Sequence, residues 1–126
     1  MDVNLPLMQK VMVVEDDEDI LFVVTFMLKQ NGFAVIALSE GEKAIPEALQ
    51  SKPDLILFDI NLGRYDGRQL CLELKTIHNV KVPILLFSAN VTLASTIHSY
   101  KADGFIPKPF DMDLLVNTVR KELDAA

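Results

Sequence analysis

The chain of 126 residues contains a single cysteine, no tryptophan and no long apolar run. No disulfide can therefore form within the chain. Cys71 lies in a helical pattern with Leu70 and Leu74, which favours a small buried apolar residue over the alternative of a reactive thiol. No run approaches the roughly 18 apolar residues that span a bilayer, and the first ten residues lack the features of a secretory signal. These absences predict a cytoplasmic protein.

Positive charge is also scarce. The chain has 12 Lys and Arg against 18 Asp and Glu, which gives a formal net charge of -6 and a pI of about 4.8. This balance argues against direct binding of nucleic-acid phosphates or of an anionic membrane. Half of the residues are apolar, which is enough for one core, and the length suits one domain. We therefore expect a single domain over residues 1–126, with no output domain.

What the sequence does contain is a set of short apolar runs that end abruptly at residues suited to phosphate or metal chemistry. The runs 11–14, 55–58, 84–87 and 105–107 are followed by Glu15 and Asp16, Asp59, Ser88 and Lys108. Runs of this kind are typical of strands buried on both faces of a parallel sheet, although a buried helix has the same pattern. Parallel strands place their carboxyl ends on one edge, where open α/β sheets bind ligands. We expect these side chains to meet there.

Strand-like and helix-like segments alternate five times, which predicts βαβ units around a parallel sheet. The expected strands cover about 10–15, 33–38, 54–58, 82–87 and 104–106, and the expected helices about 18–30, 40–50, 67–78, 91–100 and 112–124. Ser39 and Glu42 form a capping-box pattern at the second helix, and Asp111 can cap the last one. Pro46 lies inside the second helix, which should therefore be short, bent or late in starting.

Two neighbouring acids at one strand end and a third at the next are costly without a counterion. Like charges about 4 Å apart repel by about 4 kcal/mol at an effective dielectric near 20. The oxygen ligands of Glu15, Asp16 and Asp59 suit Mg²⁺, or Mn²⁺ in its place. The alternative is that Asp16 or Asp17 merely caps the first helix, but a cap explains neither Glu15 nor Asp59.

Asp59 is the expected reactive residue, because a carboxylate can attack a phosphoryl group and form an acyl phosphate. Such a transfer demands neutralisation of charge more than movement of protons. A divalent cation, the Lys108 ammonium and the Ser88 hydroxyl could together stabilise the phosphoryl oxygens. Each signal is weak alone, since a lone Lys or Ser is usually a surface residue or a cap, but their joint appearance at strand ends is specific.

In this order and spacing, the segments VMVVEDDEDI, LILFDINLGRYDG, PILLFSAN and ADGFIPKPF resemble the response regulator receiver domain of two-component signalling. The resemblance covers essentially the whole chain. It implies a flavodoxin-like, doubly wound (βα)5 fold with a five-stranded parallel sheet in the order 2-1-3-4-5. It also implies a cis peptide bond between Lys108 and Pro109.

The resemblance assigns a role to each residue of the site. Glu15 and Asp16 match the acidic metal-binding pair, Asp59 the phosphorylated aspartate, and Asn61 the residue whose backbone carbonyl completes the metal site. The remaining matches are Lys108 with the family lysine, Ser88 with the hydroxyl residue that binds the phosphoryl group, and Phe105 with the aromatic residue whose rotamer reports the active state.

The resemblance further implies a switch that catalyses its own phosphorylation and dephosphorylation, rather than a turnover enzyme. Its phosphodonor would be a histidine kinase or a histidine phosphotransferase, and its signal would pass to a downstream protein or an attached output domain. A dimer that forms on phosphorylation is compatible with it. The alternatives are a degenerate receiver that only binds proteins and an aspartate-nucleophile phosphatase, which normally has a second acid where Asn61 stands.

The first helix is unusually apolar, and Phe22 and Phe26 are neighbours on one of its faces. A helix packed on a sheet needs only one apolar stripe. Either these two residues are exposed and dock the phosphodonor, or they pack in the core or in a self-association face.

Overall fold

The sheet of the computed structural model, which describes residues 8–126, consists of five parallel strands. They are β1 (Lys10–Val14), β2 (Ala34–Leu38), β3 (Leu55–Asp59), β6 (Ile84–Ser88) and β7 (Gly104–Pro107). Their order is β2-β1-β3-β6-β7, which confirms the expected order 2-1-3-4-5 when these five strands are counted along the chain. The expectation about a secretory signal falls mainly on residues 1–7, outside the described residues.

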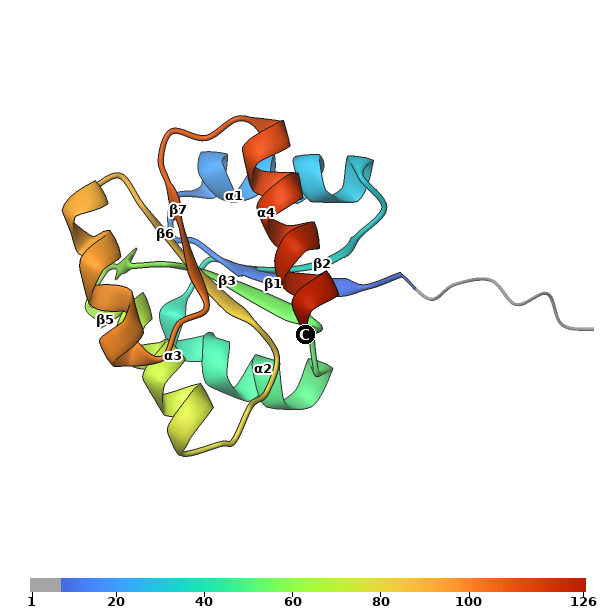
Figure 1. The fold of residues 1–126 in the computed structure, drawn as a ribbon. Helices are drawn as coiled ribbons and strands as arrows, with labels where there is room; N and C mark the ends of the chain where they lie inside the picture. The colour runs from blue at the N-terminus through green and yellow to red at the C-terminus, as the bar shows by residue number, and fades with distance from the viewer. Residues whose placement is uncertain (1–7) are drawn as a thin grey trace, which may run out of the picture.

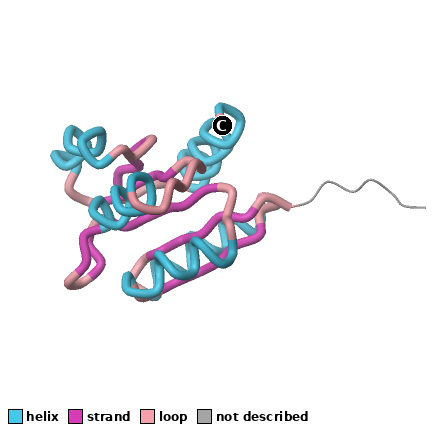
Figure 2. Tube along the Cα trace, turned by 90° about the horizontal axis from the view of Figure 1, so that it is seen from below, coloured by secondary structure: helices cyan, strands magenta, loops and turns pink. Residues whose placement is uncertain are grey.

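Helices cover both faces of the sheet, as Figure 1 shows, with α1 and α4 on one side and α2 and α3 on the other. Strands and helices alternate along the trace in Figure 2, which is the connectivity of βαβ units. The helical segments are α1 (Glu18–Gln30), η1 (Gly41–Lys43), α2 (Ala44–Ser51), α3 (Gly67–Thr76), η2 (Val91–Tyr100) and α4 (Met112–Ala125). None of the helices within residues 8–126 is long and apolar enough to cross a membrane.

The core has two halves, because alternate residues of each central strand point to opposite faces. Met12, Ile56 and Leu86 pack against α2 and α3. Val13 and Leu57 pack against α1 and α4. Both sets are fully buried, which explains why these strands appear in the sequence as continuous apolar runs rather than as alternating patterns.

The second helical region confirms one expectation and corrects another. The α-helix begins late, at Ala44, so that Pro46 lies in its first turn, where a missing N–H costs nothing. The prediction of a capping box is wrong. A 3₁₀ turn comes before the α-helix, and its N-cap residue, Glu40, makes no side-chain hydrogen bond to the turn. The delayed start separates Ser39 from the first turn of the α-helix. Asp111 caps α4 as expected, because its carboxylate accepts a hydrogen bond from the Leu114 N–H at 2.8 Å.

The helix expected over 91–100 is present with these bounds, and it is a 3₁₀ helix, η2. Hydroxyl and β-branched residues have weak helix propensity. Two of the hydroxyls also bond to carbonyls three residues earlier, from Ser95 to Thr92 at 3.2 Å and from Thr96 to Leu93 at 2.6 Å. These bonds favour the tighter turn. A 3₁₀ run of ten residues is unusually long, since runs above about four residues are uncommon.

Candidate functional site

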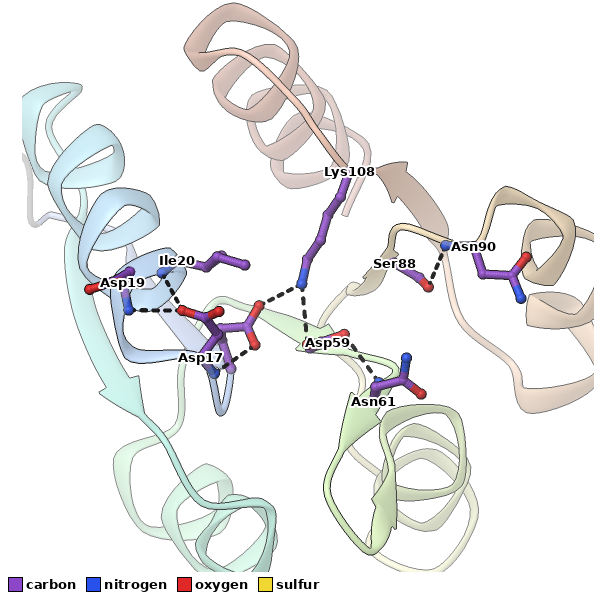
Figure 3. Close-up of polar contacts among 9 residues, drawn as sticks. Asp17, Asp19, Ile20, Asp59, Asn61, Ser88, Asn90 and Lys108 are labelled. Atoms are coloured by element: carbon purple, nitrogen blue, oxygen red, sulfur yellow. Dashed lines mark hydrogen bonds and ion pairs between the residues drawn. The ribbon is translucent and has the colours of Figure 1, made fainter.

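The residues singled out at the strand ends lie along one edge of the sheet. Glu15 directly follows β1, Asp59 and Ser88 end β3 and β6, and Lys108 follows β7. The parallel register between β1 and β3 pairs Val14 with Phe58, so that Glu15 and Asp59 come next on adjacent strands. Figure 3 shows Lys108 reaching across from its own strand towards Asp59. The edge therefore gathers side chains that are up to 93 positions apart in sequence.

The three acids form a compact cluster. Carboxylate oxygens of Glu15, Asp16 and Asp59 all lie within 4.8 Å of one another. Glu15 is 0% exposed and Asp59 is 5% exposed, whereas Asp16 is open to solvent. Two of the three negative charges are therefore held away from water, which is unfavourable unless a cation compensates them. The carboxylate oxygens are hard ligands, as Mg²⁺ requires.

Asp17 performs the capping that was the alternative explanation for the acidic segment. Its carboxylate accepts hydrogen bonds from the N–H groups of Asp19 at 3.0 Å and of Ile20 at 3.1 Å, and it is the N-cap of α1 (Figure 3). Its own N–H donates to Glu15 Oε2 at 3.0 Å. One acid thus satisfies the helix end, which leaves Glu15, Asp16 and Asp59 for another task.

Lys108 supplies the positive charge of the site. Its ammonium donates to Glu15 Oε1 at 2.7 Å and to Asp59 Oδ2 at 3.2 Å. The same nitrogen lies 4.8 Å from the centre of the Phe87 ring, within the range of a cation–π contact. Lys108 meets both Glu15 and Asp59 at the sheet edge, as expected, and its shorter contact is with Glu15. This arrangement follows from charge: with two buried acids in reach, one ammonium bridges both.

The pKa values of the site reflect this crowding. Burial, followed by the neighbouring Asp59, raises the pKa of Glu15, although Lys108 opposes the shift. Although the side chain of Asp16 is open to solvent, partial desolvation and then the neighbouring Glu15 raise its pKa. Burial alone would lower the pKa of Lys108, but its contacts with Glu15 and Asp59 outweigh burial and raise it. The cluster is therefore short of positive charge and suited to bind more of it.

The backbone around Asp59 is closely packed. The Asn61 N–H donates to Asp59 Oδ1 at 3.1 Å (Figure 3), and the Gly67 N–H donates to the Ile60 carbonyl at 2.8 Å. A Cβ atom at Gly67 would lie 2.1 Å from the Asp59 carbonyl oxygen. Position 67 therefore requires glycine. In the sequence, the only signal for this requirement is that the Asp66-Gly67 pair directly precedes a helical pattern.

The short hairpin of β4 (Asn61–Leu62) and β5 (Tyr65–Asp66), which was not predicted, connects Asp59 to Gly67. It turns at Gly63, where φ is +67°. Glycine adopts this left-handed region without strain.

The remaining predicted residues lie outside the acidic cluster. The Ser88 hydroxyl is buried and accepts a hydrogen bond from the Asn90 N–H at 3.0 Å (Figure 3). Phe105 is half-buried and packs against the side of the core that holds α2 and α3. Phe22 and Phe26 are 72% and 54% exposed on α1, so they do not pack in the core. The peptide bond between Lys108 and Pro109 is cis, as the resemblance implied.

A model of the response regulator receiver domain matches residues 11–120. The chain belongs to this family. Among curated relatives, it is 35% identical to the sensory transduction protein BceR of Halalkalibacterium halodurans over 115 residues, which are 90% of this chain and 49% of that protein. It is also 34% identical to the alkaline phosphatase synthesis transcriptional regulatory protein PhoP of Bacillus subtilis over 104 residues, which are 81% of this chain and 43% of the relative.

This receiver domain spans about half the length of these curated relatives. Among solved structures, it is similar to the receiver domain of NtrX from Brucella abortus, with 28% identity and a TM-score of 0.84 over 92% of this chain and 99% of that one. The family and the flavodoxin-like fold predicted from the sequence are thereby confirmed.

Proposed function

We propose that this receiver domain accepts a phosphoryl group on Asp59 in a reaction that requires Mg²⁺ or Mn²⁺. The donor would be the phosphohistidine of a histidine kinase or histidine phosphotransferase. The observation that carries this proposal is the joint geometry at the sheet edge: Asp59 lies within 4.8 Å of two further carboxylates and 3.2 Å from the Lys108 ammonium. A purely structural ion pair would not need the third acid, Asp16, which is exposed.

In the proposed transfer, a carboxylate oxygen of Asp59 attacks the phosphorus atom. The new P–O bond forms as the P–N bond to the histidine breaks, and the bonding electron pair leaves with the imidazole nitrogen. Lys108 neutralises charge on the phosphoryl oxygens, since it already reaches Asp59. Asp59 is buried and held by the Asn61 N–H, so its carboxylate is positioned before the donor arrives.

Glu15, Asp16, Asp59 and the backbone carbonyl of Asn61 would hold the metal. Their donor set fits the ion, because it consists of hard oxygen atoms and the carboxylates are short of positive charge. The bound cation would supply further positive charge next to the phosphoryl oxygens.

Phosphorylation would then bias the domain between two packings. Ser88 ends β6 next to Asp59, because Asp59 pairs with Phe87 in the register. Its hydroxyl would leave the Asn90 N–H and donate to a phosphoryl oxygen. Phe105, which is half-buried on β7, would pack further inward. The altered surface of η2, β7 and α4 would signal to a downstream protein or an output domain, or would form a dimer.

The test is incubation with acetyl phosphate and Mg²⁺, followed by intact-mass analysis. We expect the mass of one phosphoryl group to be gained by the wild type and not by Asp59→Asn or after addition of EDTA. No gain in the wild type would favour a degenerate receiver that only binds proteins. Continuous release of inorganic phosphate from phosphomonoesters would favour a phosphatase.

Phe22 and Phe26 would form part of the docking surface for the phosphodonor. Both are exposed on α1, the helix that begins directly after the acidic segment. A large exposed apolar pair beside a reactive site is typical of a protein interface. The exposure of both rings supports docking or self-association over core packing.

A further inference from the structure

Arg68 connects the segment after Asp59 to η2. Its guanidinium donates to both carboxylate oxygens of Asp66, most closely from Nη2 to Oδ2 at 2.7 Å, and from Nη1 to Thr96 Oγ1 at 3.0 Å. It also lies 5.0 Å from the centre of the Tyr100 ring. One side chain thus contacts the N-cap of α3 on one side and two turns of η2 on the other. These three contacts use the hydrogen-bonding fork and the flat face of arginine together, which lysine cannot reproduce.

The α3 end of this connection is rigidly coupled to Asp59. Asp66 caps α3 by accepting from the Arg68 N–H at 2.8 Å, and Gly67 lies against the Asp59 backbone. Burial alone would raise the pKa of Asp66, but the side chain and N–H of Arg68 outweigh it and lower the pKa. The contacts with Arg68 therefore favour the ionised form of Asp66, which is the form that the ion pair requires.

Apart from Arg68, η2 is held by Ile97 and the partly buried Leu93, which pack against the core, and by a contact from Cys71 Sγ to the Tyr100 carbonyl at 3.5 Å. Ile97 is the buried residue of this ten-residue 3₁₀ helix, whereas Val91, Thr92, Ser95 and His98 are exposed. Figure 1 shows η2, in orange, beside β6 and β7 and at the side of the molecule. A segment with few buried apolar contacts opens more readily than the core. Loss of the Arg68 contacts with Thr96 and Tyr100 should therefore make η2 open more often.

We propose that Arg68 is a positioning residue that fastens η2 to the segment following Asp59, and that loss of this contact favours the phosphorylated form. The proposal rests on the proposed phosphorylation of Asp59. Since η2 follows Ser88, movement of the β6 end towards a phosphoryl group would pull η2 against the Arg68 contact. A domain in which η2 is already free would populate the arrangement that accepts the phosphoryl group more often, so it should be phosphorylated more readily.

The test compares Arg68→Met with Arg64→Met. Arg64 is an exposed arginine in the turn of the β4–β5 hairpin, just before α3, and its guanidinium lies over Tyr65. In unphosphorylated protein, we expect amide hydrogen exchange in residues 91–100 to become about tenfold faster in Arg68→Met and to stay unchanged in Arg64→Met. Thr96→Val and Tyr100→Leu, which remove one partner each, should give smaller increases. Exchange in β1 and β3 should remain slow in all variants, which shows that the fold is retained.

The second readout is the rate of phosphorylation by acetyl phosphate and Mg²⁺, which we expect to rise several-fold in Arg68→Met and to stay unchanged in Arg64→Met. Unchanged exchange in 91–100, or the same change in Arg64→Met, would overturn the proposal. Faster exchange without faster phosphorylation would overturn the proposed coupling between η2 and phosphorylation of Asp59, because Arg68 would then have a purely structural role. If no variant gained mass, the wild type included, the proposed function would fail, whereas the exchange result would still decide whether Arg68 fastens η2.

Discussion

Lys108 is shared by two buried acids, and the stability of the site depends on it. Its removal would leave Glu15 and Asp59 buried without the ammonium that contacts both. Breaking a buried pair by removing one partner costs about 3–5 kcal/mol. We expect Lys108→Met to lower the free energy of unfolding at neutral pH by about 3 kcal/mol, measured by urea denaturation without added metal.

The control for this substitution is Lys81→Met, at an exposed lysine outside the site, which should change stability little. Mg²⁺ should restore part of the stability of Lys108→Met, since a cation replaces the lost charge. Equal effects of the two substitutions would show that the ion pairs at the sheet edge contribute little.

The buried thiol of Cys71 makes the stability of the fold depend on pH. The thiol is fully buried in α3, and burial raises its pKa from 9.0 to about 12. The folded state therefore keeps the thiol proton to a higher pH than the unfolded state. This contribution to stability is complete below pH 9 and is lost as the pH rises towards 12.

Because the thiolate is the reactive form, alkylation of Cys71 by iodoacetamide at pH 8.5 should be about a thousandfold slower in the folded protein than in urea. Mass analysis over time measures both rates. Rapid labelling of the native protein would contradict the burial of Cys71 and would support the alternative that Cys71 is a reactive thiol.

At the scale of single elements, α1 carries the most specific prediction. Phe22→Ala with Phe26→Ala should slow phosphotransfer from the cognate phosphohistidine protein by tenfold or more, because exposed aromatic anchors often dominate an interface. Phosphorylation by acetyl phosphate should be unchanged, since this small donor needs no docking surface. The matched control is Ile77→Ala, which removes another exposed apolar side chain (67% exposed) at the end of α3. Unchanged transfer in the double variant would exclude docking through these rings.

The elements also show what local sequence can and cannot predict. β1, β3 and β6 were predictable because both of their faces are buried, which makes them continuous apolar runs. Pro46 correctly signalled a short α2. The capping box failed because a 3₁₀ turn came first, and the hairpin of β4 and β5 was missed because two-residue strands leave no periodic pattern.

Which residues gather at the site was predictable to a similar extent. Acids and a lysine after apolar runs indicated which residues would gather, and Glu15, Asp16, Asp59 and Lys108 do so. The contacts of Arg68 with Thr96 and Tyr100 join residues 28 and 32 positions away. No periodicity records such pairs, because they depend on how η2 packs beside α3.

At the scale of the whole molecule, the strand order creates the site. β1 and β3 are neighbours in the middle of the sheet, with the register that places Glu15 beside Asp59. A shift of one residue would turn the side chains of a strand to the opposite face, and the fully buried core on both sides of the sheet resists such a shift. The two halves of the core therefore hold the acids in place as well as stabilising the fold.

The most direct test of the central claim is to locate the phosphoryl group on the chain. The protein is treated with acetyl phosphate and Mg²⁺, reduced with borohydride, which converts an aspartyl phosphate to homoserine, and digested for peptide mass mapping. We predict homoserine at position 59 and at no other aspartate, with none after omission of the metal. Homoserine at Asp16, Asp54 or Asp66 instead, or its absence at position 59 under these conditions, would contradict the assignment of Asp59 as the phosphoacceptor.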